Sequence, residues 1–342
     1  DGSFNLLNPK YIPEPYFNDL KRGILEINDI LVVKDGATTG KMGYFDDKAP
    51  FKVGAVNEHV FILRANTQKV EPYYLYQYLR SVKGNAEIVK HKVGAAQGGI
   101  NLSIRSIEIP LPPLEVQREI VEQIEVKQAA IEAARAVVEN LNRERRYFGH
   151  ELKKLQGVEW VNLGETFKKI SENIDPQQGT GETQYIGLEN IESNTGRLVG
   201  ETTTEITQIM STKTEFRKGD ILYGRLRPNL NKVWLADRDG ICSTDIYVLR
   251  SVIKGLDQRI YAVFLRSDLF NAQVLKGLTG AQVPLVGYKH LASLNVPVMP
   301  KKLEEQIGSG IEFEDSLLET NRVFGSNMEI KIENVLNDLV RG

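Results

Sequence analysis

The chain has 342 residues, 41% of them hydrophobic and 26% charged, and its formal net charge at pH 7 is −2. This is the composition of an ordinary globular protein, and the length suffices for about two domains. No apolar run reaches the ~20 residues of a membrane span, and the start lacks a signal-peptide pattern. The one cysteine, Cys242, excludes an internal disulfide framework and a cysteine-based zinc site. We expect a cytoplasmic protein.

The first part of the chain is typical of a mixed α/β domain. Runs of β-branched and aromatic residues at 30–34 and 60–63 predict strands, and 73–81 predicts a helix. A glycine-containing loop, 35–42, follows the first of these strands. A second loop, 94–101, lies shortly before the long helix described next.

A long helix follows this domain. After Pro113 the sequence runs to Leu155 without a proline, which is longer than a typical globular helix. Its apolar residues fall on two rows that each repeat every seven positions, and this spacing predicts the seam of a coiled coil. Lys127 and Arg145 interrupt the rows. The seam residues that we expect to pack are Ile124, Ile131, Val138, Leu141, Phe148 and Leu152.

The same pattern then recurs about 190 residues further on, which indicates an internal duplication. Residues 28–31 (NDIL) match 219–222 (GDIL), and 60–64 (VFILR) match 246–250 (IYVLR). Strands are again predicted at 221–223 and 246–249, and a helix at 258–267. The second long helix keeps the heptad frame of the first, and its seam residues are Ile311, Leu318, Met328, Ile332, Val335 and Leu339.

The lengths of the two helices predict how they pair. A helix of about 40 residues spans roughly 60 Å, and an antiparallel pair brings the start and the end of the second domain together, as compact domains prefer. We therefore expect two domains at opposite ends of a rod, related by a pseudo-two-fold axis. The alternative is that each helix packs only on its own domain.

The two copies differ at their beginnings. The second copy opens with residues 158–191, and nothing in the first copy matches them. We therefore expect the first domain to lack roughly 34 residues of the repeated unit.

Residues for catalysis or metal binding are not recognisable in the sequence. The four histidines, His59, His91, His150 and His290, occupy non-equivalent positions without metal-ligand spacing. Loop 35–42 has three residues between its glycines and Met42 after its lysine, so it departs from the phosphate-binding loop pattern. We expect no catalytic residues, no metal and no cofactor.

The loops of the two copies instead carry side chains that suit DNA. Arg reads guanine and Asn reads adenine, whereas Lys and Thr contact phosphates. These loops differ between copies while the flanking strands match, as expected of two modules that read different sequences. The candidate DNA-binding residues are Thr38, Thr39, Lys41, Gln97, Asn101, Arg225, Arg227, Asn229, Asn231, Lys232 and Gln282. The net charge of −2 does not by itself support DNA binding, because DNA-binding proteins usually carry a basic surface.

Three segments resemble the DNA-specificity subunit of Type I restriction-modification enzymes. They are 107–117 (IEIPLPPLEVQ), which leads into the long helix, 185–191 (YIGLENI) and 219–222 (GDIL). The resemblance implies a non-catalytic reader of a bipartite double-stranded DNA target, with the paired helices setting the spacer. It also implies partners, namely methyltransferase subunits that bring S-adenosylmethionine and restriction subunits that cut.

The expected fold class is α+β, with two mixed α/β target recognition domains separated by a long antiparallel two-helix coiled coil. The expected boundaries are 1–113 for the first domain and 114–157 for its helix, then 158–300 and 301–342 for the second pair. Two other functions stay open. The chain could be the specificity part of a fused DNA methyltransferase, or a two-headed scaffold that binds proteins.

Overall fold

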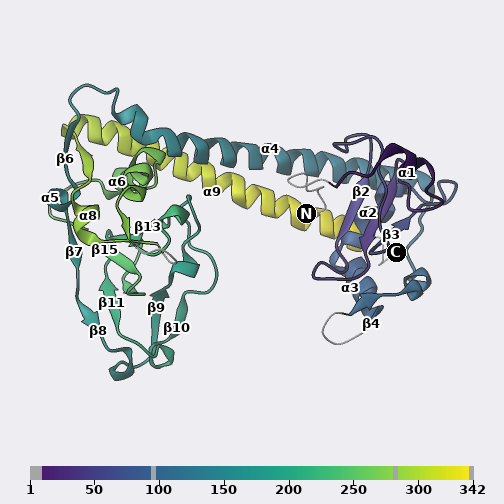
Figure 1. The fold of residues 1–342 in the computed structure, drawn as a ribbon, viewed down its shortest axis with the longest axis horizontal. Coiled ribbons are helices and arrows are strands. Elements are labelled where there is room, and N and C mark those ends of the chain that lie inside the picture. Colours follow the sequence, from purple (N-terminus) through teal and green to yellow (C-terminus); the bar gives the residue numbers. More distant parts are fainter. Residues whose placement is uncertain (1–9, 94–97, 280–283, 339–342) are drawn as a thin grey trace. The chain divides into compact units, whose positions relative to one another are not determined.

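The computed structural model of the chain describes residues 10–93, 98–279 and 284–338. The chain forms two compact units. The first unit comprises residues up to Ala134 together with those from Val323 onward, and the second comprises Arg135–Arg322. Each unit therefore holds one mixed domain and part of each of two long helices, α4 (Leu114–Leu152) and α9 (Lys301–Asp338) (Figure 1).

The first unit is built on a three-stranded antiparallel sheet. Strand β1 (Asp29–Val33) lies between β2 (Met42–Phe45) and β3 (Val60–Leu63). Its central residues are buried, which explains why the run ILVV is apolar on both faces of the strand. The remaining elements are α1 (Glu14–Asn18), α2 (Pro72–Arg80), α3 (Val82–Lys90), β4 (Lys92–Val93), β5 (Gly99–Ile100) and the 3₁₀ turn η1 (Leu102–Ser106).

The second unit repeats this order of elements. Strand β12 (Ile221–Gly224) lies between β13 (Val233–Leu235) and β15 (Ile246–Ser251). The register is the same in both copies, since Ile221 pairs with Leu249 where Ile30 pairs with Leu63. The structure thus confirms the duplication. The other repeated elements are α6 (Gln258–Leu265), α7 (Asp268–Leu275), β16 (Leu278–Thr279), β17 (Leu285–Val286) and α8 (Tyr288–Ala292).

The second unit also contains elements that the described part of the first unit lacks. Residues 159–170 form β6 (Glu159–Asn162), α5 (Leu163–Thr166) and β7 (Phe167–Ile170). Strand β7 pairs with β15 and extends the sheet, while β6 pairs with β18 (Asn295–Val298). A further sheet has the order β10 (Thr203–Glu205), β9 (Glu182–Ile186), β14 (Gly240–Cys242), β11 (Lys213–Phe216), β8 (Asn173–Ile174). The short turns are η2 (Pro176–Gln178), η3 (Leu188–Asn190), η4 (Ile206–Gln208) and η5 (Pro228–Leu230).

The long helices pair within each unit in antiparallel order. In the first unit, Ile124 near the start of α4 shares an apolar cluster with Ile332 and Leu336 near the end of α9. In the second unit, Leu152 at the end of α4 shares a cluster with Ile311 near the start of α9. The predicted fold class, with its two-helix coiled coil, is confirmed.

The predicted seam residues are buried to different degrees. Ile124, Ile131, Leu152, Ile311 and Leu318 are buried. Those partly exposed are Val138, Leu141, Phe148, Met328, Ile332 and Val335, and Leu339 lies outside the described residues.

Arg145, which interrupts the seam, is accommodated by ion pairs. Its Nε lies 2.9 Å from a carboxylate oxygen of Glu314, and its Nη1 lies 2.7 Å from one of Asp315. The side chain of Arg145 is only 10% exposed. Because a sheltered guanidinium needs hydrogen-bonding partners, these two carboxylates of α9 fix the local register of the helices.

A buried side chain of a long helix bonds to the N-cap of a helix in each domain. Gln117 of α4 is fully buried, and its Oε1 accepts a hydrogen bond of 2.8 Å from the backbone N–H of Glu71, the N-cap of α2. Its Nε2 donates to the carbonyl oxygens of Lys69 and Pro112. In the second copy the side chain of Glu304, on α9, accepts the N–H of Asp257, the N-cap of α6, at 2.6 Å.

A buried carboxylate supports the same strand in both units. Asp29 accepts two hydrogen bonds of 2.8 Å from the Arg64 guanidinium. Asp220 accepts bonds of 2.8 and 2.7 Å from Arg250, and it also accepts the backbone N–H of Arg217. These bidentate pairs join the start of β1 or β12 to the end of β3 or β15.

Replacing Asp220 with alanine should destabilise the second unit. The change leaves the Arg250 guanidinium, 22% exposed, without its bidentate partner, so we expect the free energy of unfolding to fall by about 2–4 kcal/mol. Both tryptophans, Trp160 and Trp234, lie in the second unit. Urea unfolding followed by tryptophan fluorescence therefore measures this unit.

Two variants serve as controls for this measurement. Asp29→Ala makes the same change in the first unit and should shift the tryptophan transition less. Lys154→Ala removes an exposed ion pair with Glu151 and should cost no more than about 0.5 kcal/mol. A loss from Asp220→Ala as small as that from Lys154→Ala would contradict the role assigned to the buried pair.

Candidate nucleic-acid interface

The structure brings the two predicted loops of each copy together. In the first unit the loop after β1 meets the β4–β5 hairpin, because the N–H of Ile100 donates to the carbonyl oxygen of Lys34 at 2.7 Å. In the second unit the N–H of Val286 donates to the carbonyl oxygen of Arg225 at 3.0 Å. The two bonds occupy the same place in the repeat. Each domain thus presents a composite surface made of two loops.

Cations and aromatic rings gather at this surface in the second unit. The Arg225 guanidinium carbon lies 5.3 Å from the centroid of the Tyr247 ring. The Lys169 ammonium lies 5.7 Å from the same centroid and 5.6 Å from that of Tyr288. These distances are those of cation–π contacts, which hold the two charges at fixed positions on the tyrosine faces. We call Lys169, Arg225, Tyr247 and Tyr288 the cation–tyrosine cluster.

The first unit has one such pair at the equivalent position. The Lys34 ammonium lies 5.8 Å from the centroid of the Phe61 ring, and these residues correspond to Arg225 and Tyr247 in the repeat. Lys34 also donates to the Glu58 carbonyl oxygen at 3.1 Å and lies 3.8 Å from the Asp35 carboxylate. Its charge is therefore more compensated than that of Arg225, which forms no ion pair within the described residues.

The other predicted residues of the second unit fall into two groups. Arg227 and Asn229 are exposed, and Arg227 adopts a left-handed conformation (φ 48°) in which its N–H reaches the Pro284 carbonyl oxygen at 2.8 Å. Asn231 instead is 2% exposed, and its Nδ2 donates to the Arg266 carbonyl oxygen at 2.6 Å. Lys232 donates to the Leu188 carbonyl oxygen at 2.6 Å. The side chains of Asn231 and Lys232 therefore hold the loop in place.

The predicted DNA-binding residues of the first unit also differ in what their side chains contact. Thr38 and Lys41 are exposed. The hydroxyl of Thr39 donates to the Gly36 carbonyl oxygen at 2.7 Å, and Asn101 caps the turn η1 by accepting the N–H of Ser103 at 2.8 Å. Gln97 and Gln282 lie outside the described residues.

Three members of the cation–tyrosine cluster could not be selected from the sequence. Lys169 lies on β7, Tyr247 on β15 and Tyr288 at the start of α8, and these elements are far apart in the chain. Two consecutive lysines between Phe167 and Ile170 do indicate an edge strand with charged residues. It does not indicate which rings the lysines meet.

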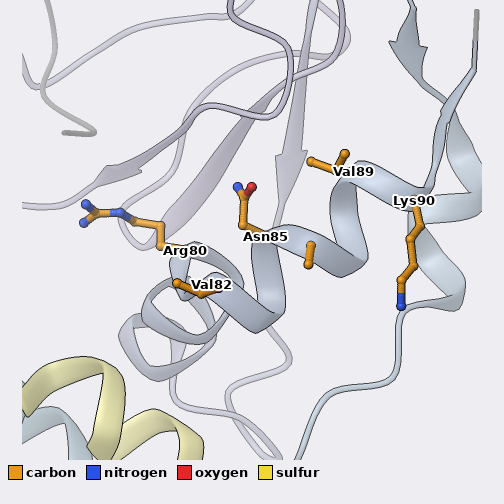
Figure 2. A pocket seen from close by; sticks show the side chains of 6 residues that line it. Arg80, Val82, Asn85, Val89 and Lys90 are labelled. Atoms are coloured by element: carbon orange, nitrogen blue, oxygen red, sulfur yellow. The ribbon is translucent and has the colours of Figure 1, made fainter. Parts of the chain in front are cut away.

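A separate hollow lies on α3 of the first unit. Its volume is about 580 Å³, and its lining includes Arg80, Val82, Asn85 and Lys90 (Figure 2). The side chains of Arg80 and Lys90 point away from each other in Figure 2, and Val82 is 74% exposed. Since its charged groups do not converge, the hollow lacks the arrangement typical of a small-molecule site.

No group of three or more His, Cys, Asp or Glu side chains within the described residues could hold a metal ion. No helix within the described ranges is long and apolar enough to cross a membrane. Burial raises the pKa of the Cys242 thiol to about 12, so the thiol is protonated at neutral pH and is a poor nucleophile.

Comparison with known proteins finds similarity to one protein family. Residues 8–140 match the Type I restriction modification DNA specificity domain. The specificity subunit of the EcoDI Type I restriction enzyme of Escherichia coli is 30% identical over 130 residues, which are 38% of this chain and 29% of that protein. The MjaVIII specificity subunit of Methanocaldococcus jannaschii is 22% identical over 94% of this chain and 80% of its own length.

A solved structure shares the fold. The S subunit of a Type I restriction-modification system from M. genitalium superposes with a TM-score of 0.54. The superposition covers 92% of this chain and 83% of that chain, at 15% sequence identity.

Alkylation of Cys242 tests the burial of the core between the two sheets of the second unit. At pH 8 we expect iodoacetamide to modify the native chain at least about 100-fold more slowly than the urea-unfolded chain, because the thiolate is the reactive form. Raising the pH from 7 to 9 should accelerate both reactions, because the thiolate fraction rises in each, but the native chain should remain the slower at every pH. Mass spectrometry measures both rates, and equal rates would contradict a buried, protonated thiol.

Proposed function

We propose that the chain is a specificity subunit of a Type I restriction-modification system, and that each of its two units reads one part of a bipartite DNA target. One observation carries this proposal. A cation lies on an aromatic ring at the same place in both copies, Lys34 on Phe61 and Arg225 on Tyr247. In each copy the two variable loops meet beside that pair.

The chemistry of the second unit suits DNA. Lys168 and Lys169 are exposed on β7, and no ion pair joins either of them to a carboxylate in the described part of the chain. They are free to contact phosphates, which fix the register of a protein on the duplex. Arg225 supplies a further cation for a phosphate, and Arg227 and Asn229 supply groups that recognise guanine and adenine edges.

The set of proposed contacts is narrower than the one expected from sequence. Asn231 and Lys232 bond to backbone carbonyl oxygens inside the unit, so we assign them to the loop scaffold. In the first unit we retain Thr38 and Lys41, and we assign Thr39 and Asn101 to the loop scaffold because their side chains bond to backbone groups of their own loops. Gln97 and Gln282 remain candidates.

The rest of the chain has a structural role in this proposal. Helices α4 and α9 set the gap between the two half-sites, and the division at 1–113, 114–157, 158–300 and 301–342 separates readers from helices. The chain itself is non-catalytic. Methyltransferase subunits and restriction subunits bind it in the cytoplasm and supply the chemistry.

Replacing Arg225 with alanine should weaken binding to duplex DNA. We expect the affinity to fall by roughly 10-fold or more, and the slope of log affinity against log salt to become shallower by about one, as for the loss of one phosphate-neutralising cation. Fluorescence anisotropy with a random-sequence duplex, at several salt concentrations, measures both quantities. The assay is run with and without a co-expressed methyltransferase subunit.

Lys254→Ala is the matched control. Lys254 is exposed in the turn after β15, at the opposite end of the strand from the loop that holds Arg225. The Lys254→Ala substitution should leave the slope of log affinity against log salt unchanged. Equal effects of the two substitutions would contradict the proposed location of the interface, and salt-independent binding of the unsubstituted chain would contradict DNA binding itself.

A further inference from the structure

The loop that carries Arg227 and Asn229 is bonded to the second domain on both sides of the turn η5. On the side of β12, the N–H of Arg225 donates to the Asp245 carbonyl oxygen at 2.9 Å. The N–H of Arg227 donates to the Pro284 carbonyl oxygen at 2.8 Å. Asn229 is exposed at the centre of η5. The positions of the two exposed side chains therefore depend on how the loop is held on its other side.

Three residues from separate parts of the second unit hold the loop where it enters β13. The side-chain Nδ2 of Asn231 donates to the Arg266 carbonyl oxygen at 2.6 Å and to the Asn194 side-chain oxygen at 3.2 Å. In return, the N–H of Asn194 donates to the Asn231 carbonyl oxygen at 3.2 Å. The Arg266 guanidinium donates to the Val233 carbonyl oxygen at 3.1 Å. We call Asn194, Asn231 and Arg266 the loop clasp.

The backbone is left-handed on both sides of η5. Arg227 has a φ of 48° and Asn231 a φ of 50°, and Asn194 has a φ of 65°. Of the described residues, only one other that is not glycine has a positive φ, Asn28. Asparagine tolerates this conformation, but it is unfavourable for arginine. Such a backbone persists only where the surrounding structure holds it, and residues of this kind cluster at binding sites.

The loop clasp is packed inside the domain. Asn231 is 2% exposed and Arg266 is 9% exposed. Gly196, with a φ of 70°, lies against them, and a Cβ atom at Gly196 would overlap the Arg266 guanidinium and the Val233 carbonyl oxygen. The two buried side chains therefore act on a bound duplex only through the loop that they hold.

We infer that the loop clasp positions Arg227 and Asn229 for base reading and thereby sets the sequence preference of the second unit. This inference rests on the proposed function. A side chain that reads a base edge must be held to within about 0.5 Å of its productive position, with arginine paired to guanine and asparagine to adenine. Phosphate neutralisation does not need this precision, and its cations lie outside the clasp, namely Lys168, Lys169 and Arg225.

Replacing Asn231 with glycine tests the inference on the full chain. Glycine adopts the left-handed backbone freely, so the substitution removes the amide bonds and changes no charge. Selection from a randomised duplex library identifies the motif of the second unit as the one that Arg227→Ala abolishes. With Asn231→Gly we expect discrimination at this motif to fall by about tenfold or more. The motif of the first unit, the affinity for a random-sequence duplex and its salt slope should stay unchanged.

Hydrogen–deuterium exchange without DNA tests the clasp separately. Exchange at residues 226–232, read by mass spectrometry, should accelerate by about tenfold in Asn231→Gly, because the loop loses its bonds to Arg266 and Asn194. Two variants of Asn194 form a matched pair. Asn194→Gly removes the acceptor oxygen and should change exchange and motif in the same direction. Asn194→Asp keeps an acceptor oxygen and should retain both the slow exchange and the motif.

Three outcomes would overturn the inference. They are unchanged exchange at 226–232 in Asn231→Gly, faster exchange with the motif of the second unit intact, and an equal loss of both motifs or of affinity for the random duplex. The last outcome indicates a general loss of structure. If the unsubstituted chain enriches no motif, the proposed function fails, whereas the exchange measurement still shows whether the clasp holds the loop.

Discussion

The capping of a domain helix by a side chain from a long helix is the contact on which the rest of the molecule depends. The first N–H groups of a helix have no partner within the helix, and burying them without an acceptor is costly. Gln117 of α4 accepts the Glu71 N–H in the first unit, and Glu304 of α9 accepts the Asp257 N–H in the second. Docking of each domain on its long helix supplies the acceptor for this N–H, whereas Glu71 and Asp257 themselves accept the N–H groups of Tyr73 and Arg259. The contact therefore fixes the orientation of each domain's helix relative to the long helix on which it packs.

The two copies keep the same framework and differ where they would meet DNA. The buried pairs of Asp29 with Arg64 and of Asp220 with Arg250 occupy identical positions and have nearly identical geometry. The loops that follow β1 and β12 share backbone hydrogen bonds, among them the bond to the neighbouring hairpin, and the cation that lies on an aromatic ring, but their side chains differ. A rigid frame with variable loops allows two different sequences to be read without a change of fold.

Much of this fold could be predicted from the sequence because its signals are periodic or repeated. The heptad rows of the long helices and the matching strand starts at 28–31 and 219–222 gave the architecture. Contacts between distant elements leave no such signal. Lys169 meets Tyr247 and Tyr288 only after β7, β15 and α8 have packed. Asn231 resembles a base-reading residue in sequence, yet its left-handed backbone (φ 50°) turns it inward to cap the Arg266 carbonyl oxygen. Leu336, 2% exposed, lies outside the predicted rows because it faces the domain and packs near Tyr74.

Selection from a randomised duplex library, at two salt concentrations, tests the central claim most directly. If each unit reads one half-site and the helices fix the distance between them, the enriched sequences contain two motifs separated by a constant gap. Enrichment at low salt that yields no motif, or two motifs with a variable gap, would contradict the account.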